Sequence, residues 1–247
     1  MKDFLLLPKG FFRRVLSSCV FLLYPHRCPV CDRTVWPPSE KICLSCLKTL
    51  KSIDHPFCEK CGKKVNAGSR ICSDCGRREH AFVRSRGAFG YAELSRGMYR
   101  YKYLGRREYA ATYAKLTYSQ LSDYIHGCSP DIIAAVPVSK KRLLKRGYNQ
   151  AGEVAKDLSY LSGIPFESGA LLRVRDTAPM KLLSPSERQK NLKNAFISNA
   201  NVVKSKRILL VDDIYTTGST MDECSRALLE AGAESVYGLT IASGAGV

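Results

Sequence analysis

Eight cysteines near the start of the chain form four C-x-x-C pairs, and no other feature of the sequence constrains the fold as strongly. The pairs begin at Cys28, Cys43, Cys58 and Cys72, and 11, 11 and 10 residues separate them. Each pair places two sulfurs on one side of a tight turn, and two turns complete a tetrahedral shell around Zn²⁺. The sequence therefore predicts two closed, structural zinc sites with eight ligands: Cys28, Cys31, Cys43, Cys46, Cys58, Cys61, Cys72 and Cys75.

The pairing of these motifs follows from loop length. Short loops close with a smaller loss of entropy, so we expect sequential sites, 28/31/43/46 and 58/61/72/75, with cross-braced pairing as the alternative. An iron–sulfur cluster or thioredoxin-like dithiols would also use such thiols. With this many thiolates available, His26, His55 and His80 are expected at the surface. Gly62 and Gly76, each directly after a cysteine, suit a sharp turn.

Residues 28–80 are rich in Cys, Lys and Gly and poor in apolar runs, so we expect them to form a double zinc ribbon. Paired thiols in this number fit metal binding in a reducing compartment better than a disulfide framework, which favours a cytoplasmic protein.

Residues 1–27 contain two apolar patches that prolines, glycines and arginines interrupt. Neither patch reaches the roughly 18 apolar residues that a membrane span requires, so we expect no integral membrane protein. No small-x-small cleavage site precedes Cys28, which argues against a signal peptide. We expect an N-terminal amphipathic leader that packs on the protein, with peripheral membrane attachment as the alternative.

From about residue 88 to residue 247, strand patterns alternate with helix patterns. Buried strands are predicted at 131–136, 207–211 and 236–242, and helices at 109–124, 151–161 and 221–231. This alternation predicts an α/β fold, a mostly parallel sheet flanked by helices. The polar segment 173–199 lacks such periodicity, and we expect it to be a mobile functional loop.

The segment 208–220, Ile-Leu-Leu-Val-Asp-Asp-Ile-Tyr-Thr-Thr-Gly-Ser-Thr, is the most informative stretch of this part. A buried strand ends in Asp212 and Asp213, at the sheet edge where α/β proteins bind ligands. These carboxylates suit ribose hydroxyls, directly or through Mg²⁺. Hydroxyls and helix N-terminal amides can hold a phosphate, and Gly218 allows close backbone approach. The candidate phosphate loop is Thr216, Thr217, Gly218, Ser219 and Thr220.

A simpler interpretation of the same segment is that Asp213 begins a turn and Ser219 caps the helix. That interpretation leaves two adjacent carboxylates at the end of a hydrophobic strand without an explanation.

The basic residues are the second sign of an anion ligand. The formal net charge is +17, and such an excess favours nucleic acid, phosphorylated metabolites or an anionic membrane surface. Five basic residues follow the strand that ends near Val136, on the presumed ligand side: Lys140, Lys141, Arg142, Lys145 and Arg146. We expect this cluster to bind an anion, although a solvated charged face is the ordinary alternative.

Segment 208–220 resembles the 5-phosphoribosyl-1-pyrophosphate (PRPP) signature of type I phosphoribosyltransferases. With the four cysteine pairs upstream, the chain resembles the ComF family, in which a double zinc ribbon precedes a phosphoribosyltransferase domain. The resemblance extends to Lys102-Tyr-Leu-Gly105, Val136-Pro-Val-Ser139 and Arg146-Gly-Tyr-Asn-Gln150. It covers nearly the whole chain from Cys28 onward.

The resemblance implies the type I phosphoribosyltransferase fold for residues 88–247 and a role for each motif. Asp212 and Asp213 would be the catalytic pair that holds the ribose of PRPP, with Mg²⁺, and residues 216–220 would hold its 5-phosphate. A hood, Arg173–Asn194, would close over the site, although Met180 replaces the glutamine that the family usually has there. Pyrophosphate would contact the segment that contains Pro137, Ser139, Lys140, Arg142 and Arg146.

The activity implied by this resemblance is that of a glycosyltransferase, which moves the phosphoribosyl group of PRPP to an unknown acceptor. The family is associated with natural competence and DNA uptake, where it acts on single-stranded DNA alongside a helicase-like partner. The net charge of +17 fits that association. The alternative is a nucleic-acid-binding protein whose phosphoribosyltransferase domain is not catalytic.

Overall fold

The computed structural model describes residues 25–175 and 192–244 of the 247-residue chain. Most of the predicted leader and most of the predicted hood, including Met180, lie outside these ranges. Within them, no helix is long and apolar enough to cross a membrane.

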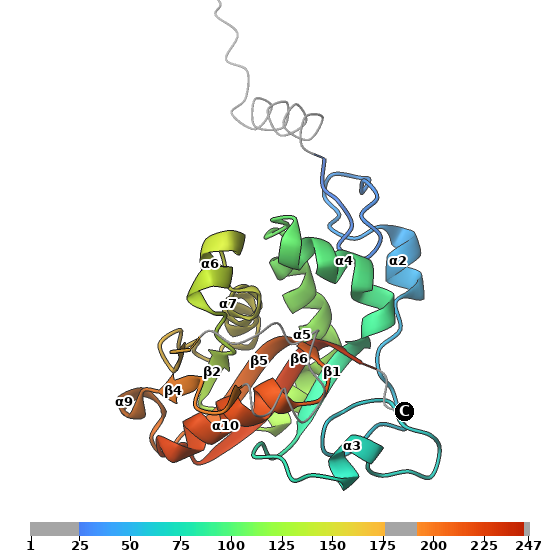
Figure 1. Cartoon of the computed structure of the whole chain (residues 1–247). Helices are drawn as coiled ribbons and strands as arrows, with labels where there is room; N and C mark the ends of the chain where they lie inside the picture. Colours follow the sequence, from blue (N-terminus) through green and yellow to red (C-terminus); the bar gives the residue numbers. More distant parts are fainter. Residues whose placement is uncertain (1–24, 176–191, 245–247) are drawn as a thin grey trace, which may run out of the picture.

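The central sheet has four parallel strands in the order β1-β6-β5-β2 (Figure 1). The strands are β1 (Ser85–Gly90), β2 (Ile132–Ala135), β5 (Arg207–Tyr215) and β6 (Ser235–Ser243). The three predicted strands are confirmed as β2, β5 and β6, whereas β1 was not predicted. Its sequence, Ser-Arg-Gly-Ala-Phe-Gly, has little apolar alternation, because Gly87 lies against β6. A Cβ atom at Gly87 would come within 2.8 Å of the Ser243 side chain.

Strand β5 continues for four residues beyond its predicted end at Val211. Asp212, Ile214 and Tyr215 pair with Thr240, Ala242 and Ser243 of β6, respectively. The apolar run predicts too short a strand, because hydrogen-bonded pairing with β6 continues beyond the apolar residues. Both carboxylates therefore lie on a paired strand, where successive side chains point to opposite faces of the sheet.

Helices cover both faces of the sheet, as predicted (Figure 1). One face carries α4 (Tyr91–Tyr103), α5 (Tyr109–Gly127) and α7 (Gln150–Ser162), and the other carries α10 (Ser219–Glu230). The three predicted helices are confirmed as α5, α7 and α10. Helices α4, α6 (Lys140–Arg146) and α9 (Ala200–Val203) were not predicted. The short strands β3 (Leu171–Arg173) and β4 (Phe196–Ser198) pair antiparallel. They lie at the two ends of the predicted hood, Arg173–Asn194, and so bring these ends together.

The two cysteine-rich segments form similar lobes at separate places. In each, the first cysteine donates its amide to the carbonyl five residues later, Cys28 to Arg33 at 2.9 Å and Cys58 to Lys63 at 2.7 Å. Asp32 and Gly62 occupy the same left-handed position in the two turns. The lobe with α2 (Leu44–Thr49) lies beside α4, and the lobe with α3 (Ser73–Gly76) lies near the β1 edge of the sheet (Figure 1).

Each lobe is packed on a different layer of helices. In the first lobe, the Pro29 carbonyl accepts a hydrogen bond from the Tyr113 hydroxyl of α5 at 2.7 Å. In the second lobe, buried cysteines share one hydrophobic cluster with Met221 and Leu228 of α10. The second lobe is therefore part of the main core, although residues 28–80 have too few apolar residues to form a core alone.

Close packing of the first lobe makes Gly97 of α4 sensitive to substitution. A Cβ atom at Gly97 would overlap the Pro29 carbonyl and crowd the Tyr113 hydroxyl. We predict that Gly97→Ala lowers the free energy of urea unfolding by about 2 kcal/mol, because overpacking outweighs the better helix propensity of alanine. Gly127→Ala is the control, because nothing lies within 4 Å of the added atom. Equal stability of the two variants would contradict the packing described here.

Candidate functional site

The eight paired cysteines form two groups, one from Cys28, Cys31, Cys43 and Cys46 and one from Cys58, Cys61, Cys72 and Cys75. This is the sequential pairing, which is thereby confirmed. Within each group the sulfur atoms lie within 4.8 Å of one another. The Sγ–Sγ distances are 3.7 Å for Cys31–Cys43 and 3.6 Å for Cys61–Cys72. A tetrahedral Zn²⁺ site with Zn–S bonds of about 2.3 Å requires sulfur atoms about 3.8 Å apart, so both groups fit zinc.

The chemistry of the donors also suits a structural metal ion. Hydrogen bonding from Cys75, opposed by burial, lowers the pKa of Cys61 to about 5, so this thiol ionises readily. Four thiolates would complete the coordination of Zn²⁺ and leave no position for a substrate. Zinc at these groups would therefore stabilise the fold and would not act on a ligand directly.

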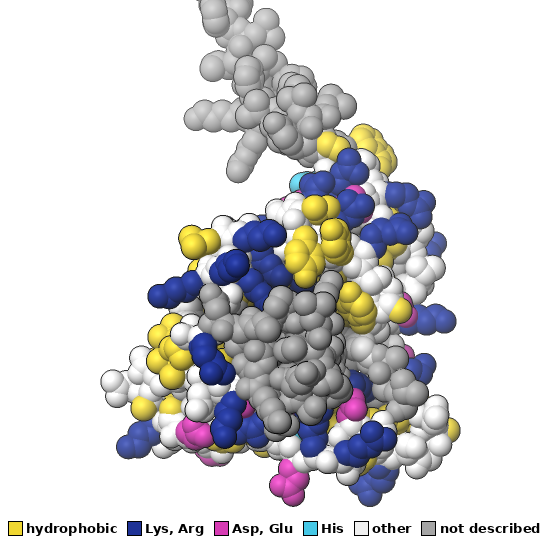
Figure 2. Space-filling view, viewed as in Figure 1, with side chains coloured by type: hydrophobic (Ala, Val, Ile, Leu, Met, Phe, Trp, Pro, Cys, Tyr) yellow, Lys and Arg dark blue, Asp and Glu magenta, His cyan; other side chains and the backbone are white. Residues whose placement is uncertain are grey.

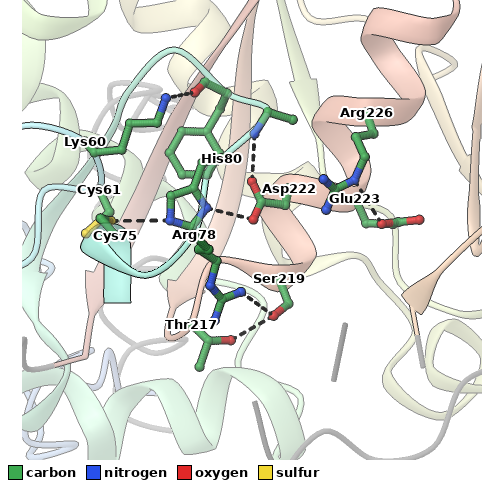
Figure 3. A network of polar contacts seen from close by, with 12 residues as sticks. Lys60, Cys61, Cys75, Arg78, His80, Thr217, Ser219, Asp222, Glu223 and Arg226 are labelled. Carbon is green, nitrogen blue, oxygen red and sulfur yellow. Dashed lines mark hydrogen bonds and ion pairs between the residues drawn. The ribbon is translucent and has the colours of Figure 1, made fainter. Parts of the chain in front are cut away.

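His80 is not at the surface, and the prediction for this residue was wrong. It is 8% exposed and lies between Cys75 and α10. Its Nε2 atom is 3.3 Å from Cys75 Sγ, and its Nδ1 atom is 2.7 Å from Asp222 Oδ2 (Figure 3). Asp222 is 142 residues away in the sequence, so local spacing gives no sign of this contact. His55, by contrast, is exposed as predicted.

The two carboxylates at the end of β5 face different surroundings. Asp213 forms an ion pair with Lys102 of α4, whose Nζ lies 2.9 Å from each of its two oxygens. Asp212 instead lines a pocket on the α10 side of the sheet. Lys102 belongs to one of the motifs that carried the family resemblance, but the sequence alone assigned it no role.

Asp212 is held in an unfavourable environment for a charge. Burial, followed by repulsion from the neighbouring Asp213, raises the pKa of Asp212 to about 7, although Lys102 opposes the shift. One of its oxygens accepts a hydrogen bond from the Asp213 amide at 2.8 Å. A carboxyl group with a strongly raised pKa in a pocket is typical of functional sites.

The loop after β5 completes this pocket. The lining residues are Asp212, Ile214, Tyr215, Thr216, Gly218, Ser219, Thr220 and Met221. The structure therefore brings together four of the five predicted loop residues with Asp212. The fifth, Thr217, places its hydroxyl 3.1 Å from that of Ser219, which also accepts a hydrogen bond from Arg78 at 3.4 Å (Figure 3).

Gly218 is the N-cap residue of α10 and has a φ angle of 78°, in the left-handed region that favours glycine. No side chain caps this helix end. The alternative in which Ser219 caps the helix is therefore wrong, and the first amides of α10 face the pocket region without a capping side chain.

The basic segment lies at the same edge of the sheet, because β2 pairs with β5 and the Val136 amide donates to the Val211 carbonyl at 2.9 Å. Pro137 follows β2 and is half-buried, and Ser139 caps α6. Lys140, Lys141 and Lys145 are exposed, whereas Arg142 and Arg146 are half-buried. Arg146 donates to Gln150 Oε1 at 2.8 Å and lies 5.1 Å above the ring of Tyr103. The residues that line the pocket beside Asp212 come from β5, the following loop and α10, and none of them from α6.

Comparison with known proteins defines the fold class of the two parts of the chain. Residues 19–76 match the double zinc ribbon domain, and residues 119–245 match the phosphoribosyl transferase domain. The fold is thus a phosphoribosyltransferase-type parallel sheet joined to a cysteine-rich N-terminal module.

Full-length relatives identify the family. The chain is 33% identical over 219 residues to Competence protein F of Haemophilus influenzae, covering 86% of this chain and 95% of the relative. It is 30% identical over 222 residues to DNA utilization protein YhgH of Escherichia coli K12, covering 87% and 96%. Competence protein ComFC of Bacillus subtilis is 29% identical over 83% of this chain and 85% of its own. The chain belongs to the ComF family.

Among solved structures, the allosteric regulatory enzyme of purine biosynthesis aligns with 58% of this chain and 30% of its own, at 21% identity and a TM-score of 0.39.

The raised pKa of Asp212 predicts a stability that depends on pH. Between about pH 4 and pH 7 the unfolded chain loses a proton that the folded chain retains, so stability falls as the pH rises. We predict that Asp212→Asn, which keeps the acceptor for the Asp213 amide, is more stable than wild type by about 2 kcal/mol at pH 8. In urea unfolding the difference should be roughly a third as large at pH 5, because only about one of the three pH units between the unfolded and folded pKa values has been crossed there. A difference of the same size at both pH values would contradict the assignment.

Proposed function

We propose that this protein binds PRPP with Mg²⁺ at the carboxyl end of β5. The observation that carries this proposal is the pocket that joins the Asp212 carboxylate to the loop Thr216–Thr220. The hydroxyls and the first amides of α10 would hold the 5-phosphate, and Asp212 would accept hydrogen bonds from the ribose hydroxyls. Asp213, held by Lys102, would support the same site from the opposite face of the sheet.

Pyrophosphate would be held by basic side chains of the segment 137–146, which leaves the same edge of the sheet. Mg²⁺, when bound with PRPP, would neutralise charge on the departing pyrophosphate. The protein would position the sugar and exclude water. A site without a nucleophile of its own accelerates group transfer in this way. The residues at this edge thus support phosphoribosyltransferase activity, with Asp212 and Asp213 as the catalytic pair. Such an enzyme is a glycosyltransferase that moves a pentosyl group.

We assign this role to a domain of residues 88–247 and metal binding to a double zinc ribbon of residues 28–80. The leader, residues 1–27, is proposed to be amphipathic, and the protein is proposed to work in the cytoplasm. The names of its relatives, a competence protein and a DNA utilization protein, support a role in DNA uptake. A helicase-like competence protein is the proposed partner in that role.

Calorimetric titration tests PRPP binding. We predict that wild type binds PRPP with Mg²⁺ and that Asp212→Asn binds it about tenfold or more weakly, a loss of about 1.4 kcal/mol or more. Asp123→Asn, on the exposed side of α5, is the matched control and should bind like wild type. Because Asp212→Asn should fold more stably at pH 8, weak binding there cannot be ascribed to unfolding. Equal affinities in all three proteins would remove the assignment.

A second candidate function, binding of single-stranded DNA, is favoured by a basic and aromatic surface on α4 and α6. Tyr99 and Tyr103 are 55% and 45% exposed, and their rings lie 5.1 Å apart. Next to them, Arg146 lies over Tyr103, and α6 adds three exposed lysines. Figure 2 shows Lys and Arg side chains over much of this face, with hydrophobic side chains between them and few acidic ones. Stacking on tyrosines together with phosphate contacts is how proteins bind single strands without sequence preference.

Fluorescence anisotropy with a labelled oligothymidine tests this surface. We predict that affinity falls about tenfold or more between about 50 and about 200 mM salt, because binding releases counterions. Tyr103→Ala should weaken binding by about 1 kcal/mol or more through lost stacking. Tyr160→Ala removes a tyrosine of α7 that is 91% exposed, and it should have no effect. Salt-independent binding, or equal loss in both variants, would count against the proposal.

A further inference from the structure

The second cysteine group is connected to the phosphate loop through one histidine. His80 is the last residue of the proposed ribbon and follows Cys75 by five residues. Its imidazole ring lies between that cysteine and α10 (Figure 3). One ring nitrogen is 3.3 Å from Cys75 Sγ, and the other is 2.7 Å from Asp222 Oδ2. A partner that holds a metal ligand orients that ligand and tunes its affinity for the metal.

Asp222, in the first turn of α10, has both oxygens occupied by this segment. While Oδ2 faces His80, Oδ1 accepts the Ala81 amide at 3.0 Å. Asp222 is only 2% exposed, so its carboxylate needs such partners. The start of α10 is therefore fastened to residues 80 and 81, which follow the last cysteine of the ribbon.

Two further contacts reach the phosphate loop itself. The His80 ring is packed so closely on Gly218 that an added Cβ atom would lie 3.1 Å from His80 Cε1. Arg78 donates to the Ser219 hydroxyl at 3.4 Å. Residues 78–81 thus contact the loop and helix at Gly218, Ser219 and Asp222.

The first cysteine group has different neighbours. Its turn residue Asp32 accepts the Tyr109 hydroxyl at 2.6 Å and pairs with Arg100 of α4 at 2.9 Å. These contacts lie on the opposite face of the sheet from α10. The two groups share one motif and fit the same metal, but their contacts with the sheet domain fall on different layers.

We propose that the second metal centre positions the phosphate loop, with His80 as the positioning residue, and that the first centre does not. This inference rests on the proposed function of the loop as a phosphate site. Since coupling between two sites is reciprocal, a phosphate ligand at the loop stabilises zinc at the second centre as much as that zinc strengthens phosphate binding. Loss of the second zinc then weakens ligand binding without any change in the residues that touch the ligand.

Zinc release to a coloured chelator measures one direction of the coupling. The Cys43→Ser background disables the first centre, so the signal reports the second. In this background we expect His80→Ala to lose zinc about tenfold faster, and His55→Ala, on an exposed residue of the same ribbon, to behave like the parent. Ribose 5-phosphate should slow release in the parent and in His55→Ala but not in His80→Ala. A ligand that binds the protein yet leaves zinc release unchanged would overturn the inference.

Hydrogen exchange at residues 217–223 measures the coupling without any ligand. Cys72→Ser, which disables the second centre without touching the Cys75–His80 contact, should accelerate exchange there, whereas Cys43→Ser should not. In His80→Ala this zinc dependence should disappear. His80→Asn keeps an amide nitrogen near Asp222 but cannot reach Cys75, so it should also lose the zinc dependence while retaining a protected α10.

These measurements separate the two ideas. If His80 only fills space, His80→Ala accelerates exchange by the same factor in the wild-type and Cys72→Ser backgrounds. The zinc dependence then persists in His80→Ala, and the positioning role is wrong. If neither ribose 5-phosphate nor PRPP binds wild type, the proposed function fails, and the exchange experiment still decides whether the metal centre controls the loop.

Discussion

The pairing of β5 with β6 is the interaction on which the rest of the site depends. It continues from Arg207 to Tyr215, well past the apolar part of β5, and so fixes the backbone of Asp212 and Asp213. Because the pleat alternates, one carboxylate faces α10 and the other reaches Lys102 of α4. The end of this strand also sets where the loop begins and where the first turn of α10 lies. A shift of one residue in this register would exchange the surroundings of the two carboxylates.

Features encoded within a short stretch could be predicted from the sequence. The cysteine pairs and the β5–loop–α10 unit are local, because each contains its own turn chemistry and its own apolar pattern. The remaining parts depend on contacts between distant segments. Strand β1 is short, and Gly87 in its centre serves close packing on β6, so its pattern carries little signal. The partners Lys102–Asp213 and His80–Asp222 are separated by 111 and 142 residues, and no spacing rule could have joined them.

The chain concentrates unfavourable electrostatics where ligands are proposed to bind. Burial and a like charge raise the pKa of Asp212, and the start of α10 has no capping side chain. Both features cost stability, and both would be relieved by a ligand that carries hydroxyl groups and a phosphate. Sites of this kind are commonly less stable than they could be, because the arrangement that serves a ligand is not the one that best serves folding. The surrounding core, which the second cysteine lobe completes, is what holds such a site in shape.

That shared core limits how the chain can be divided. A fragment that begins at residue 88 would lack the first half of β1 and would expose the side of α10 that the buried cysteines and Phe82 cover. The zinc-ribbon half is not expected to fold as an independent domain either, since its second lobe would expose to water the apolar surface that packs on α10. Metal supply during synthesis therefore bears on the maturation of the whole polypeptide, and the two halves are expected to be gained, lost and inherited together.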